Sequence, residues 1–158
     1  MRNLLLIASI LISFSAVMAQ PPFTLSANTT QGLIFGTFFQ GKIGGSVIIN
    51  PDGTRSVTGD LVQSTMGVPF SPAIFEVTAK KGSIITILNG PTIKLYGNNG
   101  GTATLKIGAS SPVSPFIITA KNNQVTIIRI GGTLTISGPL TAPSGSYSGN
   151  FYITFIQQ

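Results

Sequence analysis

Side chains that could do acid–base or metal chemistry are scarce in this sequence. The 158 residues include no His and no Cys, which removes the commonest general base, the commonest metal ligand and the thiol nucleophile. The only carboxylates are Asp52, Asp60 and Glu76. A hydrolase that uses two carboxylates would need to take its pair from these three positions.

The sequence around each carboxylate favours a structural role. Asp52 lies in the run Asn50-Pro51-Asp52-Gly53, a turn pattern in which an Asp side chain bonds its own backbone. Glu76 alternates with apolar residues and is expected on the solvated face of a strand, and Asp60 is expected at a strand end. A calcium site from Asp52 and Asp60 stays open, although the dense acidic spacing of known calcium loops is missing. We expect no catalytic residue, no cofactor and no metal, and therefore no enzyme.

The positive charge of the chain reflects scarce acids. Nine Lys and Arg residues face three Asp and Glu residues, for a net charge of +6. The basic residues are scattered, without the Arg-rich runs interleaved with aromatic residues that a nucleic-acid surface requires. We expect these charges to solubilise turns and protect strand edges. A nucleic-acid partner is not expected, whereas weak attraction to an anionic polysaccharide stays open.

The N-terminus is typical of a secretory signal peptide. A positive charge at Arg2 precedes the mostly apolar run from Leu4 to Val17, and Met18-Ala19 follows, which predicts cleavage after Ala19. The run is shorter than a membrane-spanning helix needs, and no cysteine is present for lipid attachment. We expect residues 1–19 to be removed, with no stable membrane span afterwards. The mature protein is then secreted, to the periplasm or cell surface of a bacterium.

After the signal segment, apolar residues alternate with Thr, Ser, Asn and Lys at the period of a strand. Residues 73–79 and 102–107 each place apolar side chains on one face and polar ones on the other. The closing segment shows the clearest alternation and is expected to be one central strand with its inner face in the core. The residues of that face are Tyr147, Gly149, Phe151, Ile153 and Phe155.

Turn sequences separate these segments at short intervals. Residues 46–49 and 54–57 are expected to form a hairpin around Asn50-Pro51-Asp52-Gly53. Runs rich in Gly, Asn and Pro play the same part at 80–82, 97–101, 121–123 and 138–145. The spacing predicts an all-β protein, an antiparallel β-sandwich of about 8–10 short strands. Residues 20–158 are expected to form a single domain.

Four segments in order resemble a family of secreted bacterial domains known only as domain of unknown function forty-four-oh-two. They are Leu33-Ile34-Phe35-Gly36-Thr37, residues 45–55 (GSVIINPDGTR), residues 131–136 (GGTLTI) and residues 145–155 (GSYSGNFYITF). Ile34 departs from the family pattern, which often has a polar or acidic residue there. The resemblance implies an immunoglobulin-like β-sandwich without an assigned activity. The closing segment also resembles the last strand of pilins assembled by chaperones and ushers, a likeness of fold only.

Two main functions fit these observations. The first is a non-enzymatic structural or adhesive surface protein, such as a filament subunit that assembles by β-strand addition with related subunits or copies of itself. The alternative is a monomeric sandwich that binds carbohydrate or another surface ligand through its loops. A small outer-membrane barrel fits the length, although the aromatic girdles of such barrels are not evident.

The segment from Gln20 to Asn28 is the expected donor for strand addition. Pro21-Pro22 favours an extended chain, and the next apolar residues alternate on one face. The residues of that face are Phe23, Leu25 and Ala27. The same segment would equally serve as the first strand of its own sandwich, where a tethered strand has the advantage of a high effective concentration.

Overall fold

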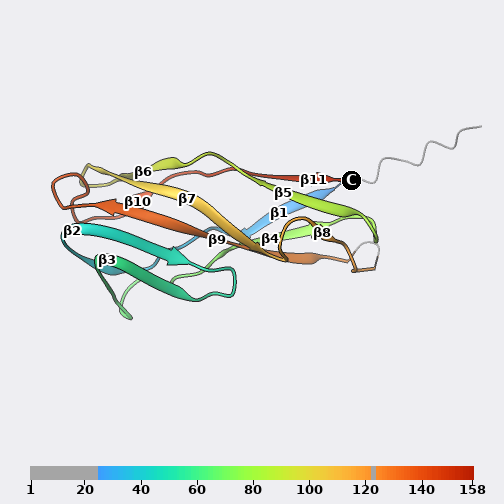
Figure 1. Cartoon of the computed structure of the whole chain (residues 1–158), viewed down its shortest axis with the longest axis horizontal. Coiled ribbons are helices and arrows are strands. Elements are labelled where there is room, and N and C mark those ends of the chain that lie inside the picture. The colour runs from blue at the N-terminus through green and yellow to red at the C-terminus, as the bar shows by residue number, and fades with distance from the viewer. Residues whose placement is uncertain (1–24, 122–123) are drawn as a thin grey trace, which may run out of the picture.

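The computed structural model describes residues 25–121 and 124–158, and every regular element within them is a strand. The expected signal peptide at 1–19 and the donor residue Phe23 lie outside the described residues. The strands form two antiparallel sheets, one large and curled and one small, in a sandwich-like arrangement (Figure 1). This confirms the predicted all-β, antiparallel fold class.

The described residues contain eleven strands. They are β1 (Ser26–Gln31), β2 (Phe38–Ile49), β3 (Arg55–Gln63), β4 (Ala73–Thr78), β5 (Ile84–Asn89), β6 (Ile93–Gly97), β7 (Thr102–Ser111), β8 (Phe116–Ile117), β9 (Thr126–Ser137), β10 (Tyr147–Ser148) and β11 (Ile153–Gln157). Eight of them make the large sheet, in which the main path runs β1-β4-β9-β7-β6-β10 while β2 and β3 branch from β9. The small sheet has the order β11-β5-β8.

The large sheet is organised around β9, which pairs with three strands. One edge of β9 pairs with β7, whereas the other is shared between β4, opposite residues 126–130, and β2, opposite residues 132–137. The sheet therefore forks where β4 gives way to β2. A Cβ atom on Gly131 would lie 2.2 Å from the carbonyl oxygen of Ile49 at the end of β2. Only glycine lets the backbone of β2 approach β9 this closely at the fork.

The core lies on the inner face of the large sheet. In β4 and β7 every second residue is buried, as the alternation of residues 73–79 and 102–107 predicted. In β9 the buried residues include Ile128, Ile130, Leu134 and Ile136. The small sheet covers part of this face, where the rings of Phe75 in β4 and Phe155 in β11 meet edge to face with centroids 5.4 Å apart.

The predicted hairpin is confirmed, with β2 and β3 paired on either side of its turn. The amide of Asn50 donates to the carbonyl of Thr54 at 2.9 Å, and the amide of Gly53 donates to the carbonyl of Asn50 at 3.0 Å. Gly53 has a φ of 88°, a left-handed conformation that favours glycine.

The closing segment differs from the single central strand that its alternation predicted. Tyr147 and Ser148 form β10, the last strand of the large sheet, beside β6. Ile153–Gln157 form β11, an outer strand of the small sheet, beside β5. The chain changes sheets between them, yet its side chains keep alternating between half-buried and exposed from Tyr147 to Gln157, apart from Gly149. The correction concerns the partners of the segment, because an alternating pattern identifies a face but not a neighbouring strand.

The close approach of β2 to β9 at the fork leads to a prediction about Gly131. Gly131→Ala places a methyl group against the backbone of Ile49, so we expect the free energy of unfolding to fall by about 2–3 kcal/mol through strain. The matched control is Gly32→Ala, because a Cβ at Gly32 meets nothing within 4 Å and its φ is not positive. Denaturant unfolding of both variants measures the difference. Equal midpoints would show that the fork tolerates a wider separation of β2 and β9.

The sheet-to-sheet contact makes a second prediction. Phe155→Ala removes the ring that packs on Phe75, and the expected loss of stability is about 3 kcal/mol. Ile156→Ala on the same strand serves as the control, because Ile156 is on the outer side and 38% exposed. That control should cost less than about 1 kcal/mol. Equal losses in urea unfolding would mean that β11 is not held through its inner face.

Candidate functional site

The described residues form an uncharged groove of about 1130 Å³ with an apolar floor. One side is residues 32–40, which lead from β1 into β2 and are here called the N-terminal wall. The other side is residues 143–153, here called the C-terminal wall, which contain β10 and the start of β11. The floor comes from four strands of the large sheet. Its residues are Phe75, Leu95, Leu105, Leu134 and Ile136.

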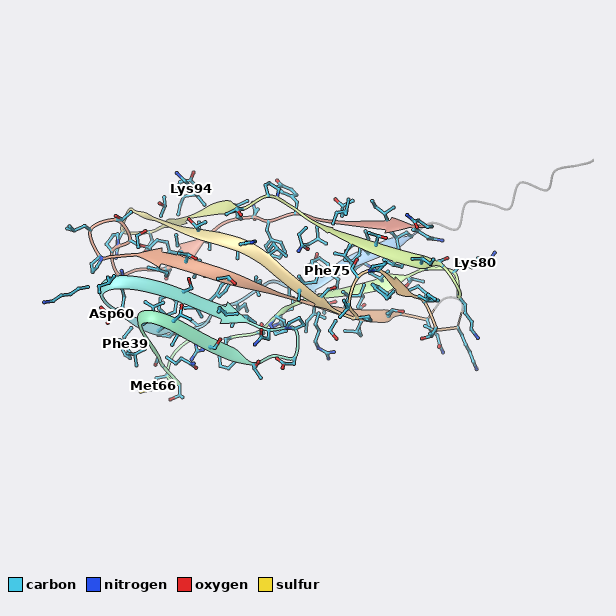
Figure 2. The ribbon with its side chains drawn as sticks, in the orientation of Figure 1. Phe39, Asp60, Met66, Phe75, Lys80 and Lys94 are labelled. Carbon is cyan, nitrogen blue, oxygen red and sulfur yellow. The ribbon has the colours of Figure 1, made fainter. Side chains whose placement is uncertain are left out.

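The floor and the rim of the groove differ in exposure. Each floor side chain is at most 7% exposed, because it points from the inner face of the curled sheet. At the rim, Phe39 is 65%, Val68 60% and Tyr152 71% exposed. Figure 2 shows Phe75 within the molecule, with Phe39 on the lower side near β3. All the described residues that line the groove are uncharged.

The N-terminal wall is fixed by Arg55 from β3. Its guanidinium donates to the carbonyls of Phe35 at 3.2 Å, Thr37 at 3.1 Å and Ser64 at 2.7 Å. The same group lies 4.3 Å from the centroid of the Phe70 ring, a favourable cation–π distance. Arg55 therefore ties the wall to the loop that follows β3.

Backbone hydrogen bonds also attach this wall to the loop that follows β3. Ile34 and Ser71 exchange two amide-to-carbonyl bonds at 3.0 and 2.8 Å, and the amide of Thr37 donates to the carbonyl of Val68 at 3.3 Å. Gly36 has a φ of 75°, and a Cβ there would lie 2.6 Å from the Arg55 guanidinium. The glycine of the predicted Leu33–Thr37 segment is thus needed both for the backbone conformation and for the approach of Arg55.

The C-terminal wall is held from one side only. The amide of Asn98 donates to the carbonyl of Ser146, and the amide of Gly90 donates to the carbonyl of Tyr152, both at 3.0 Å. Peptide groups alternate in direction along an extended chain, so those of Tyr147 and Ile153 point away from the partner strands. Neither β10 nor β11 has a strand on its second edge in the described structure.

Two side-chain details shape the same wall. The hydroxyl of Tyr147 donates to the carbonyl of Pro143 at 2.5 Å, and burial raises the pKa of this phenol. A Cβ on Gly149 would lie 2.7 Å from a methyl carbon of Leu95. The lack of a side chain at Gly149 thus lets the backbone of the wall pack closely on Leu95 of the floor. This predicted core position therefore contributes its backbone, and not a side chain, to the packing.

The three carboxylates lie outside the groove. Asp52 accepts hydrogen bonds from the amide and the hydroxyl of Thr54 at 2.9 and 2.7 Å, and these bonds lower the pKa of its carboxyl. Asp60 accepts a 3.3 Å bond from the amide of Ile43, and Glu76 lies in β4. Among the described residues, no three acidic, His or Cys side chains group as metal ligands.

The expected donor residues occupy different positions. Leu25 is half-buried and packs against both core clusters, whereas Ala27 is exposed in β1 opposite Val77 of β4. Residues 26–28 thus pair within their own chain. No helix in the described part of the chain has the length and apolar character to cross a membrane.

Sequence reasoning located one wall and missed the other. Four of the five residues predicted for the last core strand line the groove, namely Tyr147, Gly149, Phe151 and Ile153. The N-terminal wall was not predicted as a site. Its signal is an aromatic cluster at Phe35, Phe38 and Phe39, spaced too irregularly for one buried face of a strand.

Comparison with known proteins gives one match. The model of a protein family described as "Domain of unknown function (DUF4402)" matches residues 25–156. No curated protein and no solved structure gives a significant match. The matched range includes both walls and the floor, so the groove belongs to the family domain. The resemblance seen in the sequence is confirmed, whereas the immunoglobulin-like topology stays a prediction.

The hydrogen bonds of Arg55 lead to a prediction about the stability of the N-terminal wall. Arg55→Met keeps a long apolar stem but removes a donor from three carbonyls, of which that of Thr37 keeps a second bond, from the amide of Ser64 at 3.2 Å. We expect a loss of about 1–3 kcal/mol in stability. Amide exchange of residues 34–37 should accelerate more than exchange in β9. Arg129→Met, an exposed position of β9, is the control. Unchanged exchange at residues 34–37 would contradict the proposed hold.

Proposed function

The chain belongs to the DUF4402 family, whose description names no activity, and we propose that it is a non-enzymatic structural or adhesive protein of the bacterial surface whose groove accepts a β-strand. The observation that carries the proposal is the groove, which combines an apolar floor with a wall of strand edges. An added strand fits both features, since its backbone pairs with an edge while alternate side chains enter the groove.

Other ligand classes fit the groove less well. An acyl chain would match the floor but would leave the peptide groups of Tyr147 and Ile153 without hydrogen-bond partners, at a cost once water is excluded. A sugar would bring hydroxyl groups against the apolar floor, and exposed Trp, the usual platform for sugar rings, does not occur in this sequence. A peptide strand supplies both backbone partners and apolar side chains.

Export supports this function. The N-terminal pattern of Arg2, the apolar run 4–17 and Ala19 predicts secretion, and strand addition joins surface subunits without covalent bonds. Within the predicted donor from Gln20 to Asn28, residues 26–28 already pair with β4, so the uncharged residues before β1 are the part that the sequence offers as a donor. The protein then functions through assembly and needs neither a cofactor nor a catalytic residue.

The test is binding of extended peptides to the mature protein. We expect a nine-residue peptide with the sequence of residues 20–28, and an unrelated peptide of alternating Val and Thr, to slow amide exchange at Tyr147 and Ile153. Bound peptide should also raise stability, by about 2.7 kcal/mol at one hundred times its Kd. The control peptide carries Asp at the positions of Phe23 and Leu25, which places charge against the apolar floor.

The outcome separates the two functions inferred from the sequence. Protection of the C-terminal wall by both alternating peptides supports strand addition. If neither peptide alters exchange or stability while the protein binds immobilised polysaccharide, the strand-accepting function is wrong and a monomeric carbohydrate-binding sandwich replaces it.

A further inference from the structure

The two walls of the groove differ in what they offer to an added strand. The N-terminal wall already has partners for Ile34 and Thr37 in the loop after β3, and Arg55 occupies the carbonyls of Phe35 and Thr37. The C-terminal wall is bonded to β5, β6 and the residues that directly follow them, Gly90, Asn98 and Asn99, and its second edge has no strand in the described structure. An incoming strand gains most hydrogen bonds along the C-terminal wall.

The C-terminal wall also continues into the least protected edge of the fold. Natural sheets protect their edges with bulges, charges or very short strands. β1 contains a register shift between Thr29 and Gln31, β3 carries Asp60, and β8 and β10 have two residues each. β11 has five residues, no charge, no proline and no register shift. Its open edge is suited to pairing with another strand.

The described chain begins at one end of the long axis, and the groove lies further along the molecule. Figure 1 shows β1 beginning beside the C-terminus at one end of the long axis, while β10 and the β2–β3 hairpin lie towards the other end. The groove reaches from Thr29, in the middle of β1, to the loop at residues 143–146. A segment that precedes β1 therefore joins the molecule away from its own groove.

The short length of this segment limits how much of its own groove it can occupy. Cleavage after Ala19 leaves five residues, from Gln20 to Thr24, before the described chain, which span at most roughly 17 Å. To reach its own groove, the segment would have to fold back along β1. The distance from Leu25 to Thr29 is about 13 Å, at roughly 3.3 Å per residue. The folded-back segment would therefore end near Thr29, where the groove begins. A neighbouring molecule has no such restriction.

We infer that the groove binds the N-terminal segment of a second copy of this chain, paired along the C-terminal wall, so that copies join end to end. The inference rests on the proposed strand-accepting function and names its donor. Groove and segment match in charge, since neither contains a charged side chain, and Phe23 supplies an apolar side chain for the floor. Because donor and acceptor occupy different surfaces, the contact is heterologous and produces open chains of subunits.

The absence of cysteine from the native chain allows a direct test by disulfide formation. One chain carries Thr24→Cys in the donor segment. A second chain, distinguished by an affinity tag, carries Asn150→Cys or Ser148→Cys on the C-terminal wall, or Phe39→Cys on the N-terminal wall. All three acceptor positions are exposed, so the variants should fold, and their denaturant midpoints check this. The chains are mixed in their mature form and oxidised.

We expect the C-terminal wall variants to form at least about tenfold more mixed dimer than Phe39→Cys, because a disulfide requires Cβ atoms about 3.5–4.5 Å apart. A chain carrying both Thr24→Cys and the better acceptor should form a ladder of multimers. Cross-linking only to Phe39→Cys would overturn the wall assignment, and closed dimers alone would overturn the end-to-end arrangement.

The result can be separated from the proposed function. If the alternating peptides protect Tyr147 and Ile153 but no mixed dimer forms, the groove accepts strands and the donor is not a second copy. If the peptides also fail to bind, both proposals are wrong. Electron microscopy of the mature protein adds an independent readout, with filaments expected for wild type and lost in Phe23→Asp.

Discussion

β9 contributes more apolar inner face than the second sheet covers. It is twelve residues long, whereas the strands of the small sheet have five, six and two residues. Ile128 lies opposite Phe75, which is covered by Phe155 of the small sheet. Leu134 and Ile136, further along β9, form the floor of the groove instead. The groove thus extends beyond the part of the inner face that the small sheet covers, and the segments that form its walls largely bury its floor.

The walls are held in ways that suit a chain without cysteine. Disulfides cannot form, so packing and hydrogen bonds must position every segment. On the N-terminal side the guanidinium of Arg55 holds the wall in place, because it donates hydrogen bonds to three carbonyls that have no partner in a neighbouring strand. On the C-terminal side, the same demand for backbone pairing is met by β5 and β6 along one edge only. Under the proposed function, this asymmetry gives the groove a preferred side for an added strand.

The sequence predicted the parts of this structure that depend on local pattern. The hairpin around Gly53 and the buried faces of β4 and β7 follow from turn chemistry and alternation, both of which are local. The change of sheet near Gly149 was missed, since the same alternation serves a strand beside β6 and a strand beside β5. The groove could not be predicted either, because its floor unites residues as distant in sequence as Phe75 and Ile136. Only the three-dimensional arrangement shows which of the buried residues remain without a covering layer.

Under the proposed function, the groove also links assembly to folding. Its floor side chains are already nearly buried, so an added strand gains its free energy from backbone pairing and from covering rim residues such as Phe39 and Tyr152. A ligand that binds only the folded chain stabilises that fold by mass action, so each occupied groove strengthens the subunit that holds it. A chain without cysteine gains most from such a contact, because no disulfide adds to its stability.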